Sequence, residues 1–366
     1  MCKSAQNKDF KAFIKALKTF KKFKFRGRNE LLNSYAEIKD CVLTLNNFQT
    51  DPFEERFSIK FMSEILGCFN GAYKIDDLIK MFECGSNISL NRIASSCGSD
   101  FKCIADGFEF VIHGVSCCDD APLNNNKELI YSSCISIDDF NFVSKAVDKD
   151  SLKKDSLKKE LLCVCLSNNA YVACDRHRLH LYGFTTLKLD NSAPEPCPCF
   201  IPPDIIKLVN SVTPKNGIIN IMWNEGQARI STGQFLIEYE FDKKMRFVDF
   251  SKVIHPTNSK YEYDVNSEIM INALKRIDVP KTCQVRCEFK NDIAVFSSAV
   301  KDSIQQVECK INTQENEVLF FVNKFFLIDG LDGFVNPTLW ARDCDTPIVL
   351  RENSIPRISV VMPMNP

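Results

Sequence analysis

The sequence predicts an α+β fold of three similar domains, and three observations carry that prediction: a long repeat, paired helices and alternating strands. Three segments begin with an aromatic residue and a strand-like step and then run into an apolar helix: Tyr73–Phe82, Phe200–Val209 and Phe321–Leu331. They start at residues 73, 200 and 321, so the period is near 120 residues. That period is too long for a solenoid and fits three copies of one domain. At 366 residues, the chain is also too long for one ordinary core.

Each repeat contains two predicted helices. The later helix of each copy has Asp76, Pro203 or Asn323 at or near its start, where a side-chain acceptor or a fixed φ is favourable. The earlier helix of each copy is marked by apolar residues at helical spacing. These earlier helices are predicted at Asp9–Lys22, Ile137–Lys149 and Ser267–Ile277.

Between the helices, apolar and polar residues alternate as they do in half-buried antiparallel strands. The predicted strands include Cys41–Leu45, Gln227–Ser231, Phe235–Phe241, Val285–Phe289 and Ile293–Phe296. Each domain is therefore expected to have two helices packed on antiparallel sheets.

Two turn-rich segments predict the domain boundaries. Asp119–Asn126 and His255–Ser259 are rich in Asp, Asn, Pro and Ser, as linkers between domains usually are. They divide the chain into predicted domains at residues 1–126, 127–254 and 255–366.

Charge is balanced overall but uneven along the chain. The formal net charge is −1, whereas Asp9–Arg28 and Asp148–Glu160 are rich in lysine. Such segments are either solvated faces or parts of one positive surface that meets phosphates. No apolar run approaches the roughly 18 residues that span a bilayer, and the first residues lack the apolar core of a secretory signal. We expect a cytoplasmic protein with no membrane association.

The 18 cysteines are spread over the whole chain without any C-x2-C spacing. A structural zinc site usually needs that spacing, and a disulfide framework is improbable in the cytoplasm. Reduced thiols that act as small buried apolar groups are the favoured interpretation. A metal site and redox regulation are the less favoured alternatives. We expect no cofactor and no metal.

Two short segments carry the functional signal. Ala173-Cys174-Asp175-Arg176-His177-Arg178-Leu179 closely resembles the A-T-D-G-H-R-L loop of bacterial sliding clamps, the beta subunits of DNA polymerase III. Val360-Val361-Met362-Pro363-Met364 resembles the V-V-M-P-M end of the same proteins. The resemblance has recognisable motifs over roughly residues 128 to 366 and is weak before them. It identifies the chain as a divergent member of that family.

The resemblance implies a DNA clamp fold whose two chains close head to tail into a dimeric ring. In the family, the helices line the hole and the sheets form the outer wall. The implied function is to encircle double-stranded DNA without reading its sequence and to hold the replicative DNA polymerase on it. The implied partners are that polymerase, the clamp loader and other proteins with a clamp-binding motif; no catalytic site is expected. The approximate interface is the Phe108–His113 strand of domain one against Lys275–Asp278 of domain three.

The family's partner-peptide pocket can be carried over residue by residue. One side is formed by the 173–179 loop with Leu161, and Val248 and Val253 match a segment that adds to it. The complete predicted pocket is Leu161, Cys174, Arg176, His177, Arg178, Leu179, Val248, Val253, Asn323, Phe326, Val360, Met362, Pro363 and Met364. Its apolar members suit leucine and phenylalanine side chains, and His177, Arg178 and Asn323 suit a peptide backbone or a glutamine.

Basic helix faces are the predicted contacts to DNA phosphates. The predicted DNA-facing residues are Lys11, Lys15, Lys18, Lys22, Lys145, Lys149, Lys153, Lys207, Lys275 and Lys324.

The chain departs from the family pattern at the pocket. Cys174 stands where threonine is usual, Arg176 where glycine is usual, and Val248 where proline is usual. Asn365-Pro366 replaces a basic and apolar end. Arg176 is the most consequential of these departures, because glycine tolerates a backbone turn that arginine resists.

Three other functions compete with the clamp. Cys174, Asp175, His177 and His180 form a reactive-looking cluster, but their strand–turn–strand context does not make such a spacing converge, and no catalytic motif is present. A clamp-like paralogue that serves as a binding platform without loading on DNA is the main alternative. A monomeric DNA-binding protein that uses the lysine-rich first helix is the third.

Overall fold

The computed structural model describes two compact units. Unit 1 comprises Met1–Ile137 and Ile201–Lys244, and unit 2 comprises Asp138–Phe200 and Met245–Pro366. Each unit contains one half of the middle repeat, so this division follows the sheets and not the repeats. The boundaries of the three domains therefore stay a prediction. The described residues are 7–21, 35–39, 42–47, 57–62, 71–83, 88–94, 99–105, 108–112, 114–115, 128–147, 159–167, 170–183, 197–247, 249–254, 259–280, 284–290, 292–300, 303–313 and 317–364.

A nine-stranded antiparallel sheet forms the centre of unit 1. Its strands follow the order β8-β4-β1-β2-β3-β16-β15-β14-β9. Their bounds are β1 Tyr35–Lys39, β2 Val42–Asn47, β3 Phe57–Met62, β4 Gly71–Lys74, β8 Gly114–Val115, β9 Tyr131–Ser136, β14 Ile218–Asn224, β15 Gln227–Thr232 and β16 Phe235–Glu240. A smaller sheet in the same unit has the order β5-β6-β7 and the bounds Ile88–Ala94, Ser99–Ala105 and Phe108–Ile112.

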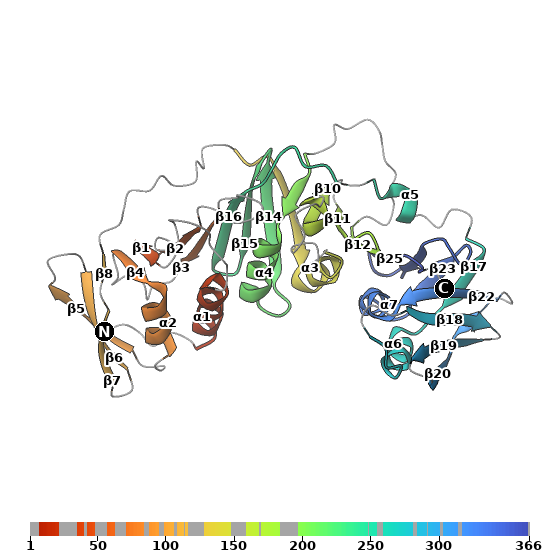
Figure 1. Ribbon diagram of the computed structural model, residues 1–366. Helices are drawn as coiled ribbons and strands as arrows, with labels where there is room; N and C mark the ends of the chain where they lie inside the picture. Colours follow the sequence, from red (N-terminus) through yellow and green to blue (C-terminus); the bar gives the residue numbers. More distant parts are fainter. Residues whose placement is uncertain are drawn as a thin grey trace. The chain divides into compact units, whose positions relative to one another are not determined.

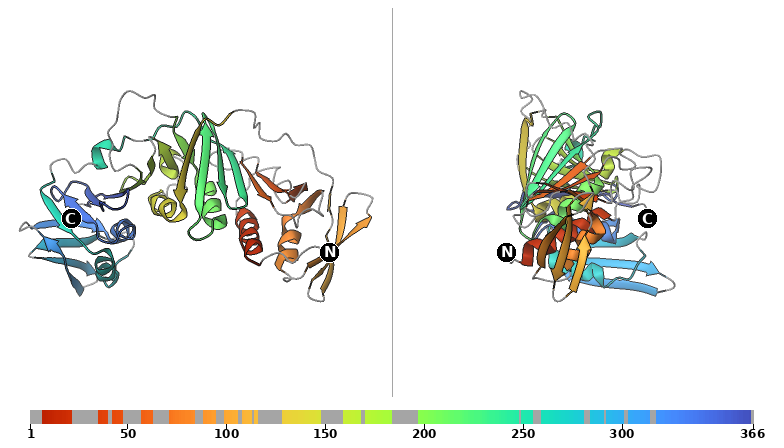
Figure 2. Two further views of the ribbon diagram at one scale, coloured as in Figure 1. Left: turned by 180° about the vertical axis from the view of Figure 1, so that it is seen from behind. Right: turned by 90° about the vertical axis from the view of Figure 1, so that its left-hand side faces the viewer.

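Three helices of unit 1 pack together against this sheet: α1 (Asn7–Lys21), α2 (Ile75–Glu83) and α4 (Pro203–Val212). In Figure 1, α1 lies between α2 and α4, and the view from behind in Figure 2 shows the same order. α1 buries Ala16, Leu17 and Phe20, whose spacing places them on one helix face.

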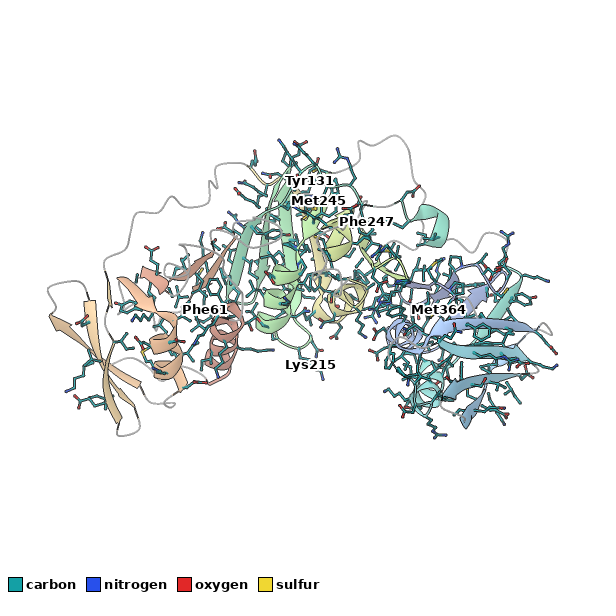
Figure 3. The ribbon with its side chains drawn as sticks, viewed as in Figure 1. Phe61, Tyr131, Lys215, Met245, Phe247 and Met364 are labelled. Atoms are coloured by element: carbon teal, nitrogen blue, oxygen red, sulfur yellow. The ribbon has the colours of Figure 1, made fainter. Side chains whose placement is uncertain are left out.

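One strand pair of unit 1 joins the first repeat to the second. β3 pairs with β16 in an antiparallel register that sets Ile59 opposite Ile237 and Phe61 opposite Phe235. The rings of Phe61 and Phe235 have centroids 4.9 Å apart, and Phe61 is labelled in Figure 3. A cross-strand aromatic pair of this kind stabilises the sheet. The sheet is therefore continuous from one repeat to the next.

An ion-pair network crosses the same joint. The carboxylate of Glu238 on β16 accepts hydrogen bonds from Lys60 on β3 (2.6 Å) and from Arg229 on β15 (2.9 Å). Burial opposes ionisation of Glu238, but these two cations outweigh it and hold the pKa of the carboxyl below its ordinary value. The carboxylate thus ties both repeats to one charged centre.

Unit 2 contains a second nine-stranded sheet, in the order β13-β10-β11-β12-β25-β24-β23-β17-β21. The bounds are β10 Val164–Ser167, β11 Ala170–Cys174, β12 Arg178–Tyr182, β13 Cys199–Ile201, β17 Tyr261–Asp264, β21 Asn312–Thr313, β23 Thr338–Ala341, β24 Ile348–Arg351 and β25 Arg357–Val361. A four-stranded sheet has the order β20-β19-β18-β22, with β18 Gln284–Lys290, β19 Ile293–Val300, β20 Ser303–Lys310 and β22 Val318–Asn323.

Two helices of unit 2, α6 and α7, begin with capping residues that the sequence supplies. Asn266 accepts a hydrogen bond from the Ile269 amide at the start of α6, and Asn323 accepts one from the Phe325 amide at the start of α7. The unit's helical segments are α3 (Ile137–Ser144), a 3-10 turn (Lys159–Leu162), α5 (Ser251–Ile254), α6 (Ser267–Lys275) and α7 (Lys324–Leu331).

A second joint, equivalent to the first, connects the middle repeat to the last. β12 pairs with β25 and sets Leu179 opposite Val360 and His180 opposite Ser359. In each joint, the third strand after the first helix of one repeat pairs with the third strand after the second helix of the next repeat. This rule places the two motif segments beside each other.

The predicted α+β class, all six helices and the five predicted strands are confirmed, although α3 ends at Ser144, before the predicted Lys149. Lys22, Cys41 and residues 148–149 of these predictions lie outside the described residues. The two linkers fall largely or wholly outside the described residues, so their predicted role is untested. Within the described part of the chain, every helix is too short or too polar to cross a membrane.

Candidate functional site

The loop between β11 and β12 is held in place by one aspartate. Asp175 accepts hydrogen bonds from the amides of His177 (3.0 Å) and Arg178 (2.9 Å) through the same oxygen. This is the turn chemistry that aspartate favours. The loop thereby exposes His177 and Arg176 and buries Asp175 and Arg178.

Arg176 adopts a backbone conformation that is unfavourable for an arginine. Its φ is +76°, and its amide donates to Cys174 Sγ at 3.3 Å. The left-handed region costs an L-residue roughly 1–2 kcal/mol, whereas glycine enters it without a steric penalty. The comparison with the family motif therefore correctly identified residue 176 as a position with a left-handed backbone conformation, which glycine favours and which arginine occupies here.

Arg176→Gly is therefore expected to raise the free energy of unfolding by roughly 0.5–1 kcal/mol, since relief of strain exceeds the added entropy of the unfolded chain. Urea unfolding followed by circular dichroism measures the change. Asn216→Gly (φ +63°) and Asp292→Gly (φ +62°) are matched controls with a much smaller expected gain, because Asn and Asp tolerate this region. A less stable Arg176→Gly protein would mean that contacts of the arginine side chain outweigh the strain.

Arg178 is the centre of the site. Its Nε donates to Asp175 Oδ2 at 2.9 Å, its Nη1 pairs with Asp329 of α7, and its guanidinium lies 4.5 Å from the centroid of the Phe326 ring. The residue is 8% exposed. Its positive charge is therefore paired with carboxylates of the 174–178 loop and of α7.

The C-terminal segment meets this loop directly. The Met362 amide donates to the His177 carbonyl at 2.8 Å, and the Met364 amide donates to the Phe321 carbonyl on β22 at 2.7 Å. Met364, labelled in Figure 3, lies beside the strands of unit 2 near α7. Met362, Pro363 and Met364 are half-buried, so each offers part of an apolar side chain to solvent.

The other predicted pocket residues divide into three groups. Leu161, Leu179 and Val360 are buried apolar residues. The His177 ring stacks on the Phe326 ring, with centroids 6.0 Å apart. Asn323 is 7% exposed and caps α7, so at least its Oδ1 is occupied. Half-buried Val253 lies in α5, which packs beside β25, whereas Val248 lies outside the described residues.

The predicted DNA-facing lysines also fall into groups. Lys15, Lys18, Lys207 and Lys275 are exposed, and Lys18 and Lys207 form surface ion pairs with Glu83 and Asp204. Lys145 is partly exposed and pairs with Asp332. The side chain of Lys11 and all of Lys22, Lys149 and Lys153 lie outside what the structure describes.

Lys324 does not belong with the exposed lysines, and its predicted role is withdrawn. Its side chain is 6% exposed, and its ammonium donates to the Ile277 carbonyl at 2.5 Å, just past the C-terminal end of α6. Cations are favourable at that end of a helix. The sequence places Lys324 at the start of a helix but gives no sign of this partner.

The reactive-looking cluster of the enzyme hypothesis is not assembled. His180 is fully buried on β12 and bonded to the Phe142 carbonyl (2.8 Å), whereas Asp175 is committed to Arg178 and His177 is exposed. Among the described residues, no group of three His, Cys, Asp or Glu side chains could hold a metal ion.

Five cysteines fit the interpretation as small buried apolar groups, whereas Cys134 and Cys344 are exposed and Cys174 and Cys197 are half-buried. Cys163, Cys165, Cys199, Cys287 and Cys309 are buried thiols. Burial raises the pKa of Cys165 and Cys287, and that of Cys309 to about 11, which disfavours the reactive thiolate.

Three α+β repeats joined edge to edge, with the two motif segments brought together, define the DNA clamp architecture. No family model and no curated protein matches the sequence. Solved structures do match. A DNA polymerase sliding clamp from Pseudomonas aeruginosa is 16% identical, with a TM-score of 0.74 over 98% of both chains.

Two further solved structures agree with this one. A putative DNA polymerase III beta subunit from Eubacterium rectale is 11% identical with a TM-score of 0.75, over 98% of both chains. The DNA polymerase III beta subunit from Thermotoga maritima is 17% identical with a TM-score of 0.73, over 98% of this chain and 97% of that one. The chain therefore has the fold of DNA sliding clamps.

Proposed function

We propose that this protein is a DNA sliding clamp, a divergent relative of the DNA polymerase III beta subunits. Two copies encircle duplex DNA and tether the replicative polymerase and other partners through a peptide-binding pocket, which gives processivity. The observation that carries the proposal is the hydrogen bond between the Met362 amide and the His177 carbonyl. It unites, in a chain with the clamp fold, the two segments whose sequences resemble the clamp pocket.

Ring closure follows from the rule that governs the two joints. β3 pairs with β16 and β12 pairs with β25, which leaves β20 and β7 as the equivalent third pair. Among the described strands, each of these two has a neighbour on one side only. A second copy that supplies β7 to β20, and receives the reverse, closes a head-to-tail dimer. This proposed pairing uses β7, which is the described part of the predicted Phe108–His113 interface strand, and adds β20 to the predicted Lys275–Asp278 region.

The exposed lysines support contact with DNA. Lys15 and Lys18 on α1 and Lys207 on α4 lie on packed helices of unit 1, and Lys275 ends α6 in unit 2. Lysines of this kind attract phosphates without distinguishing bases, so a ring held by topology can slide. The clamp acts in the cytoplasm as an accessory protein with three domains, bounded at residues 126 and 254, and is not an enzyme. The clamp loader is a further partner.

A peptide titration tests the proposed pocket. A fluorescent peptide, glutamine-leucine-any residue-leucine-phenylalanine, is expected to bind saturably to the wild type. Met362→Ala is expected to weaken binding about tenfold, because truncation of an apolar anchor costs about 1.4 kcal/mol. Fluorescence anisotropy gives both affinities.

Met222→Ala is the matched control, since Met222 is 41% exposed on β14 of the other unit. It should bind like the wild type. Absence of binding by the wild type, or equal weakening by both substitutions, would contradict the pocket.

The alternative is a clamp-like binding platform that does not load on DNA. The arginine at position 176 and the weak resemblance of the first repeat favour it. Retention on nicked circular DNA, with loss after linearisation, distinguishes a loaded ring from such a platform, because only a ring slides off free ends.

A further inference from the structure

We propose that Arg178, Asp175 and Asp329 are positioning residues of the peptide pocket. They hold the 174–178 loop against α7, so that the His177 and Phe326 rings form one preorganised side of the pocket in the absence of a bound peptide. Arg178 thus acts through these two rings and not as a contact to the peptide. This inference rests on the function proposed above.

The contacts of Arg178 join two segments far apart in the sequence. Asp175 belongs to the loop and Asp329 to α7, and the guanidinium bridges them. Phe326 and Asp329 are three residues apart, so they share one face of α7. One side chain therefore fixes the loop by Asp175 and the helix face by both Asp329 and Phe326.

Burial makes these contacts strong and selective. Arg178 and Asp175 have side chains 8% and 10% exposed, whereas Asp329 is 38% exposed. Water and salt screen a charge-assisted pair less in such surroundings than at the surface. Loss of one partner leaves the other charge buried without compensation. The planar guanidinium of arginine can bond to two carboxylates and lie over an aromatic ring at the same time, whereas the single ammonium of lysine cannot make all three contacts.

The loop needs such restraint. Arg176 sits at φ +76°, a conformation that persists only where the surrounding structure imposes it. The Asp175 carboxylate accepts hydrogen bonds from the His177 and Arg178 amides through Oδ1 and from Arg178 Nε through Oδ2. Loss of the bond to Asp329 would weaken the attachment of this strained loop to α7 and leave only the contacts with Phe326 described above.

The other wall of the pocket depends on the same loop. The His177 carbonyl accepts the Met362 amide, and the His177 ring lies beside Phe326. A loop that moves away from α7 would therefore displace the methionine segment and separate the rings. Preorganisation of this kind removes an ordering cost from binding.

Unit 2 contains a matched cluster that supplies controls. Arg357 pairs with Asp139 at 2.6 Å, donates to the Gly333 carbonyl at 2.6 Å and lies 5.3 Å from the Phe142 ring centroid. The chemistry is an arginine, a carboxylate and a phenylalanine in both cases. The Arg178 cluster includes Asp175 of the 174–178 loop, whereas the contacts of Arg357 are to Asp139, Gly333 and Phe142.

Binding kinetics with the same labelled peptide test the proposal on the full-length protein. Arg178→Lys and Asp329→Asn are expected to lower the association rate about tenfold with little change in the dissociation rate, because fewer molecules hold the competent loop. Asp329→Glu, which keeps a carboxylate, should recover most of the rate. Arg357→Lys and Asp139→Asn should leave both rates within about twofold, even where they reduce stability.

Hydrogen exchange supplies a readout without peptide. In Arg178→Lys, the amides of His177 and Met362 should exchange at least about tenfold faster, and those of the Arg357 variants should not. A loss confined to the dissociation rate would assign Arg178 as a direct contact and overturn the proposal. Unchanged association in Arg178→Lys, or equal losses in Arg357→Lys, would also overturn it. Failure of the wild type to bind is a separate result that removes the proposed function and this inference with it.

Discussion

Acidification from about pH 6.5 to pH 4 is expected to lower the free energy of unfolding by about 1.4 kcal/mol per pH unit through His180 alone. The ring is fully buried and stacks on Phe142, with centroids 4.6 Å apart. Its Nδ1 lies 2.8 Å from the Phe142 carbonyl, so Nδ1 carries the proton of the neutral ring. Nε2 has no hydrogen-bond partner within the described residues. A second proton there would create a buried cation without an acceptor.

The direction of the pH effect follows from the pKa. Burial lowers the pKa of His180 to about 3, aided by the nearby charges of Arg178 and Lys145 and opposed by the bond to the Phe142 carbonyl. The unfolded chain takes up its proton near pH 6.5, whereas the folded chain does not until about pH 3. The stabilisation is thus fully present above pH 6.5 and is lost as the pH falls toward 3.

Urea unfolding at half-unit pH steps measures this slope. His180→Gln keeps a donor for the Phe142 carbonyl but does not titrate, so its stability should depend less on pH between 6.5 and 4. His177→Gln is the control, because it removes an exposed histidine from the neighbouring loop and leaves His180 in place. An identical slope in His180→Gln and the wild type would show that His180 does not govern the acid sensitivity.

Local sequence signals predicted the elements of this fold but not the joints between its repeats. Helical spacing placed α1, and Pro203 and Asn323 marked the starts of α4 and α7. Those signals act within a few residues, so one sequence contains them in full. The pairing of β3 with β16 depends on residues about 180 positions apart, and no spacing within either strand indicates it.

The candidate site shows the same limit. The two motif segments could be predicted to meet because their sequences resemble a known pocket. The pairing of Arg178 with Asp329 could not be predicted, since Asp329 lies 151 residues away in the sequence. Lys324 was misassigned for a related reason: a lysine at a helix start looks exposed until a neighbouring helix brings a carbonyl to it. Asp175 was the residue that turn chemistry could have identified, because aspartate favours bonds to the amides that follow it.

Gly333→Ala is expected to destabilise unit 2 by about 3 kcal/mol or more, because the new methyl has no room. A Cβ at Gly333 would lie 2.3 and 2.4 Å from two carbons of the Phe142 ring. That ring is 2% exposed and is held by His180 on one side and by Phe334 and Arg357 on others. It cannot swing away as the end of a flexible side chain could, so the backbone after α7 must shift.

A double-mutant cycle isolates this contact. Phe142→Leu alone should destabilise the protein, since it removes part of a buried ring. Combined with Gly333→Ala, it should cost less than the sum of the two single changes by roughly 1–3 kcal/mol, because the smaller side chain makes room for the methyl. Gly233→Ala is the comparison for backbone strain alone, with φ +54° and no atom within 4 Å of the new Cβ, and should cost only about 1 kcal/mol. Strict additivity in the cycle would mean that the close approach of Gly333 to Phe142 does not restrain this part of unit 2. Coupling would explain why glycine follows α7: α3 and α7 approach closely here only where residue 333 has no side chain.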